Sequence, residues 1–388
     1  MRRLVIVGAG LAGHRAAQAA RRAGFAGELM VVGSEVHRPY DRPPLSKQLL
    51  AGTIEHEDTF YEYEHLDAEW VLGQAAVGLD PAGHVVALAD GSEIEYDALV
   101  LATGRRAREW PDLPDLDGFF MLRDLDHTAA LRQVVAPDRH VVIVGSGFIG
   151  CEVAATLRGL GVTDVHLIDI APYPMPVLGP EVGARAIALH ERHGVHLHLS
   201  SGVEAFHGAD GRVTTVALNG GEQITADLVL LALGSVPNTE WLEGSGLELV
   251  GGAVKVDEYC LAAEGVAAAG DIALYPHPGS PGEPICIEHW SNARDMGAVA
   301  ARNLIVAPQE RERFVAVPTF WSDQYDVKIK SVGLLKLADR YEVVEEDVEK
   351  PRLVVEAYHR DELIGAIVFN KNRAIIDYTR RLQAELLV

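Results

Sequence analysis

Two glycine-rich stretches decide the fold of this chain, Gly8-Ala9-Gly10-Leu11-Ala12-Gly13 and Gly145-Ser146-Gly147-Phe148-Ile149-Gly150. Each follows a run of apolar residues and opens a helix-like segment, which predicts a strand–turn–helix unit. In such a turn the first glycine permits the bend, the second lets the backbone approach a pyrophosphate, and the third lets the helix pack on the strand. The N-terminus of the helix then faces the anion. Two such units predict two bound dinucleotides, between which a hydride can pass.

An acidic residue follows each glycine-rich stretch at the distance that suits a ribose hydroxyl. Ser34 and Glu35 come directly after the strand expected over residues 28–32, and Asp169 ends the strand that is expected from residue 164 onward. A carboxylate at this second position accepts from the ribose 2′-hydroxyl and repels a 2′-phosphate. Because residues 170–177 hold no basic side chain, we expect the second unit to bind NADH rather than NADPH.

The composition argues against several functional classes. A formal net charge of −22 disfavours nucleic acid as a partner. We expect no membrane span, because no stretch approaches about 18 consecutive apolar residues. A secretory signal peptide is disfavoured because its cleavage would destroy the first glycine-rich stretch. We therefore expect a cytoplasmic location.

The cysteines and histidines do not indicate a metal or dithiol centre. The three cysteines are far apart, which disfavours a redox dithiol and a cysteine-rich zinc or iron–sulfur site. They are Cys151, Cys260 and Cys286. Four histidines invite a metal interpretation, but they lack a cysteine partner and residues 194–199 have strand-like spacing. These histidines are His190, His193, His196 and His198. We expect no metal site.

Further motifs resemble those of the two-dinucleotide flavoproteins. They include the Ala102-Thr103-Gly104 turn, the turn over residues 233–238 and Gly270-Asp271. Disulfide reductases of this group would carry a cysteine pair soon after the first acidic strand, where this chain has Arg38-Pro39-Tyr40-Asp41-Arg42-Pro43-Pro44-Leu45-Ser46-Lys47. That run, together with residues 287–293 and 320–325, is similar to the NADH-dependent ferredoxin reductases that serve oxygenases and cytochromes P450.

The resemblance covers essentially the whole chain and implies its architecture. We expect an α/β fold with two Rossmann-like dinucleotide-binding domains, the NAD-binding domain being inserted in the FAD-binding domain, and an α+β C-terminal domain. The expected boundaries are 1–106 and 238–316 for the two parts of the FAD-binding domain, 107–237 for the NAD-binding domain and 317–388 for the C-terminal domain.

The resemblance also places a set of residues around FAD. Lys47 is expected beside the flavin ring, as a fixed cation where negative charge develops, with Arg42 supporting the FAD in the same segment. Trp290 and Trp321 are expected to flank the flavin or to offer an electron route, although a tryptophan without a redox role is an equal alternative. The expected FAD contacts are Gly8, Gly10, Leu11, Ala12, Gly13, Ser34, Glu35, Arg42, Lys47, Ala76, Ala102, Thr103, Gly104, Arg123, Gly270, Asp271, Glu288, His289, Trp290 and Trp321.

A second set is expected around NADH. Glu152 is expected to reach toward the nicotinamide and to act with Lys47 as the catalytic pair, although an acid in the first turn of a helix is also favoured by the helix dipole alone. Relatives often carry arginines at the positions of Tyr173 and Val177, so the detailed nucleotide contacts differ here. The expected NAD contacts are Gly145, Gly147, Phe148, Ile149, Gly150, Glu152, Asp169 and Gly234.

These expectations describe a flavoprotein that passes electrons from NADH through FAD to a small acidic iron–sulfur ferredoxin, as a monomer or weak homodimer. Residues 317–388 carry 11 Lys and Arg against 13 Asp and Glu, so this region repels an acidic partner less than the rest of the chain. The bases expected to dock the ferredoxin are Arg294, Lys328, Lys330 and Arg373. Alternatives are a rubredoxin reductase, an NADH oxidase, or an NADH-sensing interaction protein that resembles apoptosis-inducing factor.

Overall fold

The first glycine turn lies in a mostly parallel six-stranded sheet. In the computed structural model, which describes residues 1–347 and 350–386, the sheet has the order β20-β21-β7-β1-β2-β3, and only the β20–β21 pair is antiparallel. Its strands are β1 (Arg3–Val7), β2 (Glu28–Gly33), β3 (Glu69–Leu72), β7 (Ala98–Leu101), β20 (Leu261–Ala263) and β21 (Val266–Ala268). The apolar runs of β1 and β7 are buried because this parallel sheet is covered by other elements.

Two helices pack side by side on this sheet. They are α1 (Leu11–Arg22) and α5 (Trp290–Ile305). Gly297 lets them approach closely, since a Cβ there would lie 2.2 Å from the carbonyl oxygen of Ala12. A small antiparallel sheet of β4 (Ala76–Asp80), β5 (Val85–Leu88) and β6 (Glu93–Glu95) is inserted before β7.

The second glycine turn lies in an all-parallel sheet of the order β12-β11-β10-β16-β9. Its strands are β9 (Phe119–Phe120), β10 (His140–Val144), β11 (Asp164–Asp169), β12 (His196–Leu199) and β16 (Leu228–Leu231). Its helices are α2 (Leu125–Val134), α3 (Phe148–Gly159) and α4 (Pro180–Arg192). A separate antiparallel sheet holds β13 (Val203–Ala209), β14 (Arg212–Leu218) and β15 (Gln223–Thr225).

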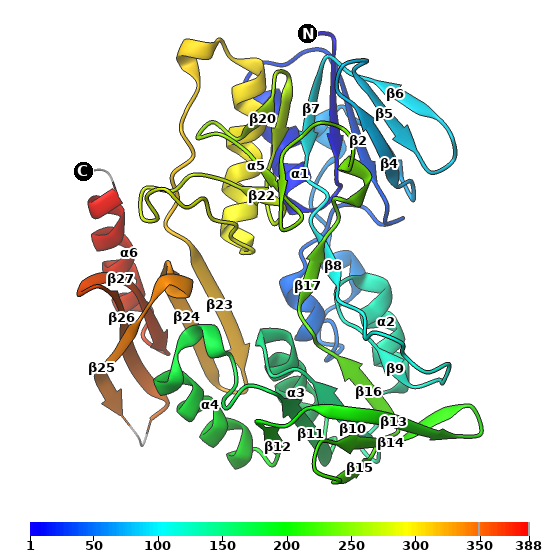
Figure 1. Cartoon of the computed structure of the whole chain (residues 1–388), viewed down its shortest axis with the longest axis vertical. Helices are drawn as coiled ribbons and strands as arrows, with labels where there is room; N and C mark the ends of the chain where they lie inside the picture. Colours follow the sequence, from blue (N-terminus) through cyan, green and yellow to red (C-terminus); the bar gives the residue numbers. More distant parts are fainter. Residues whose placement is uncertain (348–349, 387–388) are drawn as a thin grey trace.

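Two short crossings join the two Rossmann-like units. The chain leaves the first sheet through β8 (Arg105–Ala107) and returns through β17 (Ser235–Pro237), and these strands pair antiparallel. In Figure 1 they lie between the upper unit, which holds β2 and β7, and the lower unit, which holds β10. The returning chain forms a small sheet of β18 (Leu249–Val250), β19 (Ala253–Lys255) and β22 (Ala273–Leu274) before reaching α5.

The last part of the chain forms an antiparallel sheet of the order β23-β24-β27-β26-β25, with α6 (Asn372–Leu386) packed on β24 and β27. Its strands are β23 (Thr319–Gln324), β24 (Val327–Gly333), β25 (Arg340–Asp347), β26 (Arg352–His359) and β27 (Glu362–Phe369). The expected fold class is therefore confirmed.

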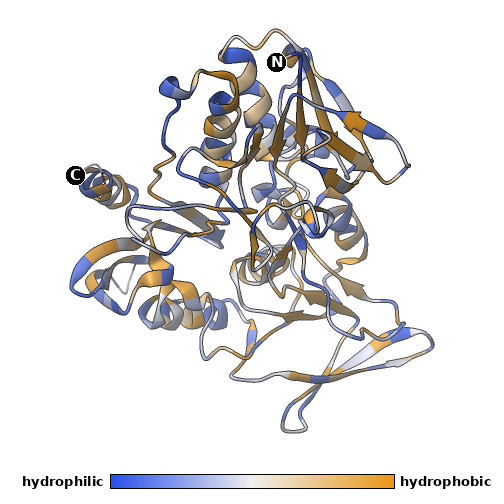
Figure 2. Ribbon diagram, turned by 45° about the horizontal axis from the view of Figure 1, so that its top comes forward, coloured by the Kyte–Doolittle hydropathy of each residue, from blue (hydrophilic) through white to orange (hydrophobic). Residues whose placement is uncertain are grey.

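Figure 2 shows hydrophobic residues concentrated along the sheet strands and mixed with hydrophilic residues on the covering helices. Within residues 1–347 and 350–386, we find no helix with the length and apolar character needed to cross a membrane.

Candidate active site

The first glycine turn is shaped for a close backbone approach. Gly8 has a φ of +123°, and a Cβ there would lie 2.0 Å from the carbonyl oxygen of Ala102. A Cβ at Gly13 would lie 1.8 Å from the carbonyl oxygen of Gly8, so α1 packs directly on the turn. A Cβ at Gly10 would meet nothing within 4 Å. The middle glycine therefore faces open space, which fits a pyrophosphate at the N-terminus of α1.

The second glycine turn has nearly the same geometry, with similar distances from each glycine to its neighbours. A Cβ at Gly145 would lie 2.3 Å from the carbonyl oxygen of Ala232, and one at Gly150 would lie 1.9 Å from that of Gly145. A Cβ at Gly147 would again meet nothing within 4 Å. Both turns thus have a cradle that fits a dinucleotide phosphate.

A single cavity of about 1120 Å³ reaches both turns and is lined by residues of both parallel sheets and of the C-terminal sheet. The expected site residues that line it are Gly8, Gly10, Leu11, Ala12, Ser34, Glu35, Arg42, Lys47, Ala76, Ala102, Thr103, Gly104, Arg123, Asp271, Glu288, Trp290, Trp321, Gly147, Phe148, Ile149, Glu152 and Gly234. The other expected residues do not line it: Gly13, Gly270, His289, Gly145, Gly150 and Asp169. The glycines among them belong to the packing of the turns or, for Gly270, lie against Ala12 and Ala293.

Lys47 and Glu152 form a largely buried ion pair in this cavity. Lys47 Nζ lies 2.6 Å from Glu152 Oε2, and the two side chains are 11% and 6% exposed. Glu152 is the fifth residue of α3 and lies beyond its first turn. The alternative expected from the sequence, an acid placed in the first turn by the helix dipole alone, is therefore wrong. Lys47 follows a 3₁₀ turn over Pro43–Ser46, where two prolines restrict the backbone. The pair therefore links the two Rossmann-like units at one carboxylate.

Two hydroxyl groups complete the surroundings of this carboxylate. Ser46 Oγ donates to Glu152 Oε2 over 2.5 Å, and Ser322 Oγ donates to Glu152 Oε1 over 2.7 Å. Ser322 lies on β23, so the C-terminal sheet also contributes to the site. Sequence reasoning did not select either serine, because neither has a spacing signal of its own.

A buried chain of hydrogen bonds extends from Ser322. Gln324 Nε2 donates to Ser322 Oγ over 3.1 Å, which leaves Gln324 Oε1 to accept from His190 Nε2 over 3.2 Å. The other ring nitrogen of His190 then accepts from the Tyr325 hydroxyl over 3.0 Å. Burial lowers the pKa of His190 to about 4, so its ring is neutral near pH 7. Each hydrogen bond in this series donates in the direction of Glu152. The series therefore ends on the Glu152 carboxylate, which accepts from Ser322.

Glu35 is held by its own loop segment. Tyr40 Oη donates to Glu35 Oε2 over 2.6 Å, and Arg42 forms an ion pair with the other carboxylate oxygen. Arg42 Nη1 also donates to the carbonyl oxygen of Arg123 over 2.8 Å. Burial raises the pKa of Tyr40 above its ordinary value, which keeps the phenol protonated as a donor. The segment after the first acidic strand therefore supports Glu35, and Tyr40 is a member that sequence reasoning missed.

Asp169 has a local structural role in addition to its predicted one. Its Oδ2 accepts from the backbone N–H and the hydroxyl of Ser146, over 2.6 and 2.8 Å, and its Oδ1 accepts from the N–H of Ala171 over 2.8 Å. These bonds tie the end of β11 to the second glycine turn. Its contact with a ribose stays a prediction.

The two expected tryptophans meet at the edge of the cavity. The rings of Trp290 and Trp321 pack edge to face with centroids 5.7 Å apart, and Trp290 Nε1 donates to Asp41 Oδ1 over 2.7 Å. His289 is partly buried, and its desolvation lowers its pKa to about 4. Arg123 and Asp271, which also line the cavity, pair over 3.3 Å.

Comparison with known proteins identifies the family. Residues 2–297 match the model of the pyridine nucleotide-disulphide oxidoreductases, and residues 319–386 match that of the reductase C-terminal domain. The chain belongs to this oxidoreductase family. The resemblance inferred from the motifs is therefore confirmed, and FAD and NAD(H) are its cofactors.

Individual members of the family are similar along most of the chain. Rhodocoxin reductase from Rhodococcus erythropolis is 36% identical, over 95% of this chain and 87% of its own length. The ferredoxin–NAD(+) reductase subunit of the benzene 1,2-dioxygenase system of Pseudomonas putida is 34% identical, over 85% of this chain and 80% of its own. A chain of the covalent putidaredoxin reductase–putidaredoxin complex superposes with a TM-score of 0.90 at 30% identity, covering 98% of this chain and 93% of that one.

Proposed function

We propose that the chain is an FAD-containing NADH:ferredoxin reductase that supplies electrons to an oxygenase or a cytochrome P450. The observation that carries the proposal is the single cavity that both glycine turns face, with the Lys47–Glu152 pair in its wall. The choice of acceptor is supported by the relative from Pseudomonas putida, which is a ferredoxin–NAD(+) reductase subunit of a dioxygenase system.

The chemistry of hydride acceptance and single-electron release is supplied by FAD when it is bound. The chain contributes binding and electrostatics. Lys47 places a cation in a water-poor part of the cavity, where it stabilises developing negative charge without reorganisation. Glu152 and its two serine donors hold that cation in one position. The open faces of Gly10 and Gly147 leave room for the two pyrophosphates.

Basic residues gather beside Trp290 and support a docking surface for an acidic carrier. Trp290 lines the main cavity and also a second cavity of about 490 Å³, which is lined in addition by Arg15, Arg22 and Arg294. The guanidinium of Arg294 lies 5.3 Å from the centre of the Trp290 ring. Glu62 also lines this second cavity, and Arg294 is paired with Asp295 over 2.6 Å. The three arginines still outnumber these two carboxylates, in contrast with the net charge of −22 of the chain, and this local excess of positive charge would steer an acidic partner toward the tryptophan pair.

The bases of β24 extend this surface toward the C-terminal sheet. Lys330 pairs with Trp321 in the ladder between β23 and β24, and Lys328 is exposed two residues earlier. Arg373 is exposed on α6, which packs on β24. We propose that Arg294 and Lys330 lie closest to the docked carrier, because each neighbours one of the two tryptophans.

Charge reversal tests the docking surface. Arg294→Glu and Lys330→Glu should each slow ferredoxin reduction at low salt, with a smaller effect at high salt. Arg212→Glu, at an exposed position of β14, is the matched control and should leave the rate unchanged. Equal rates for all three variants at low salt would contradict the proposed surface.

A panel of carriers separates the proposed function from its alternatives. We expect fast reduction of cytochrome c through an acidic [2Fe–2S] ferredoxin and slow reduction through rubredoxin or by oxygen alone. Oxygen consumption at the rate of the ferredoxin assay would favour an NADH oxidase, and faster turnover with rubredoxin would favour a rubredoxin reductase. Slow reoxidation by every carrier, with a change of oligomeric state on NADH addition, would favour a redox-sensing interaction protein.

The domain boundaries, the cellular location and the oligomeric state remain proposals, and the first two have partial support. The β8–β17 crossing supports boundaries near residues 106 and 237 for an inserted NAD-binding domain, with the other boundaries as expected from the sequence. The three cysteines are free thiols, which is common in proteins of a reducing compartment and supports a cytoplasmic location. A monomer or weak homodimer is expected, and sedimentation at several concentrations tests it.

A further inference from the structure

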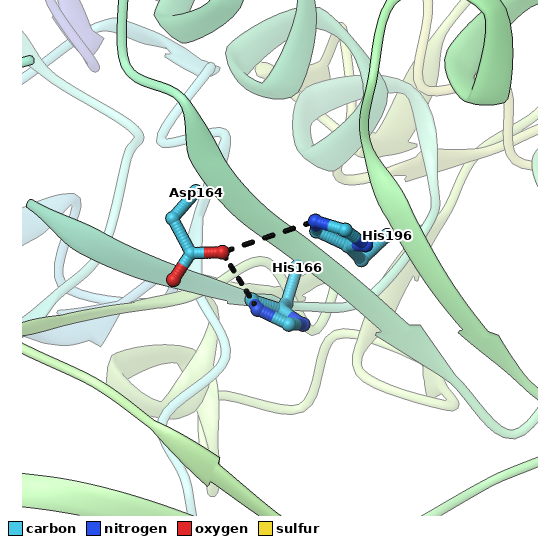
Figure 3. A group of neighbouring side chains, drawn as sticks. All are labelled: Asp164, His166 and His196. Atoms are coloured by element: carbon cyan, nitrogen blue, oxygen red, sulfur yellow. Dashed lines mark hydrogen bonds and ion pairs between the residues drawn. The ribbon is translucent and has the colours of Figure 1, made fainter.

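We propose that Asp164, His166 and His196 form a binding site for a divalent transition-metal ion such as Zn²⁺. Figure 3 shows the three side chains, with Asp164 and His166 on β11 and His196 on the neighbouring edge strand β12. The site lies outside the dinucleotide cavity, whose lining includes none of these residues. An imidazole–carboxylate set of this kind suits zinc, copper or nickel rather than magnesium or calcium.

The strand register brings the ligands together. His166 pairs directly with His196 in the parallel ladder, and Asp164 lies two residues before His166 and so on the same face of β11. The sequence does not predict this arrangement, because its histidine-rich segment over residues 190–198 contains only one of the three ligands. The missing partners come from a strand that lies about 30 residues earlier in the chain.

The two separations from Asp164 lie on either side of the one that a tetrahedral ion requires. Ligand atoms about 2.1 Å from a tetrahedral Zn²⁺ lie about 3.4 Å from one another. Asp164 Oδ1 lies 3.1 Å from His166 Nε2 and 3.9 Å from His196 Nε2, and all three ligand atoms lie within 4.8 Å of one another. The rings of His166 and His196 are stacked, with centroids 4.8 Å apart and planes 25° apart, so His196 has to turn before its ring nitrogen faces an ion bound to His166. Its side chain is 57% exposed, which leaves room for this rotation. Three protein ligands would leave a fourth position for water.

Outer partners of the ligands support this arrangement. His166 Nδ1 lies 2.9 Å from His198 Nε2, and the other ring nitrogen of His198 lies 3.4 Å from Glu222. Asp164 Oδ2 lies 2.5 Å from His140 Nδ1. Ligating histidines and carboxylates normally have such hydrogen-bond partners, which fix the tautomer and orient the ligand. Two of the three ligands here already have them.

The position of the site predicts a structural effect. Asp164 begins β11 and Asp169 ends it, so the ion would lie about 16 Å from the end of the strand that faces the second glycine turn. An ion here would cross-link β12 to the sheet. Zn²⁺ should therefore raise the thermal midpoint of the protein, while the rate at which NADH reduces the bound flavin stays the same.

Binding of the metal alone tests the site. The tag-free, FAD-loaded protein is titrated with Co²⁺, and binding is followed by the visible absorption of the bound Co²⁺. A second titration uses Zn²⁺ in competition with a chromophoric chelator. We expect one ion per chain, displacement of Co²⁺ by Zn²⁺, and no competition by Mg²⁺. The variants His166→Ala and His196→Ala should each fail to bind the ion. Zn²⁺ should then no longer raise their thermal midpoint.

Two further variants separate a built site from general histidine binding. His198→Ala removes an outer partner and should weaken the affinity by about 10–100-fold. His207→Ala, at an exposed histidine of β13, should change nothing. Unchanged flavin absorption in every variant shows that the chain is folded. Absence of stoichiometric binding, or binding that survives both His166→Ala and His196→Ala, would overturn the proposal.

Discussion

Replacing either member of the Lys47–Glu152 pair is expected to lower the free energy of unfolding strongly. Replacing both should lower it by less than the sum of the two single losses. The pair is 2.6 Å long and nearly buried, so solvent screens it little. Removing one partner of such a pair typically costs about 3–5 kcal/mol, because the other charge is left uncompensated. After Lys47→Met, the Ser46 and Ser322 hydroxyls still donate to Glu152. After Glu152→Gln, Lys47 Nζ keeps the longer contact with Ser46 Oγ at 3.2 Å.

These contacts set the expected free energies of unfolding. We expect a loss of about 2 kcal/mol for Lys47→Met and about 4 kcal/mol for Glu152→Gln, because the two hydroxyls compensate the carboxylate better than one compensates the ammonium. The double variant should lose about 3 kcal/mol, which gives a coupling of about 3 kcal/mol. The measurement is equilibrium urea unfolding of the FAD-loaded proteins, in which the midpoint and slope give each free energy.

An exposed pair provides the matched control. Lys255 Nζ lies 2.8 Å from Glu248 Oε1, with side chains 45% and 61% exposed, and Lys255→Met should cost less than about 1 kcal/mol. Strict additivity of the two single variants at Lys47 and Glu152 would refute the reasoning, since it would mean that the two charges act independently.

Three further predictions concern the turns, the buried histidine and the choice of nucleotide. Gly8→Ala should abolish FAD binding, because its Cβ would lie 2.0 Å from the carbonyl oxygen of Ala102, whereas Gly10→Ala should fold normally but bind FAD more weakly; flavin absorption per chain and the thermal midpoint measure both, and full FAD content in Gly8→Ala would contradict this. Burial lowers the pKa of His190 to about 4 from an ordinary 6.5, so the stability it confers is complete above pH 6.5 and is lost as the pH falls toward 4; His190→Gln should remove up to about 3 kcal/mol of that pH dependence, and an unchanged slope of stability against pH would count against it. Asp169→Asn should lower the ratio of kcat/KM for NADH over NADPH, because the carboxylate no longer repels a 2′-phosphate; an unchanged ratio would show that Asp169 serves only the turn at Ser146.

The fold followed from local signals because the glycine turns encode their own geometry. The spacing of Gly8, Gly10 and Gly13 predicts a bend, an open backbone and a close helix contact, and each of these is found. The second turn repeats them. The C-terminal α+β unit lacks such a signal, and its position was inferred from the resemblance.

The site was harder to predict because its decisive contacts join distant segments. Ser322 meets Glu152 across 170 residues, and His190 meets Gln324 across 134. No local sequence pattern predicts either contact, because each of these residues by itself is typical of an ordinary polar position. The cluster around His166 is similar, because a strand register decides which histidines become neighbours. The ion pair of Lys47 and Glu152 was expected only through the family resemblance, and its catalytic role stays a prediction.

An anaerobic single-turnover experiment tests the central claim most directly. The FAD-loaded protein is mixed with one equivalent of NADH and then with an excess of oxidised [2Fe–2S] ferredoxin, while flavin and ferredoxin absorbance are followed separately. The account predicts that one NADH bleaches one flavin and that two ferredoxin molecules are then reduced per flavin reoxidised. A flavin that NADH does not bleach, or a bleached flavin that leaves the ferredoxin oxidised, would contradict it.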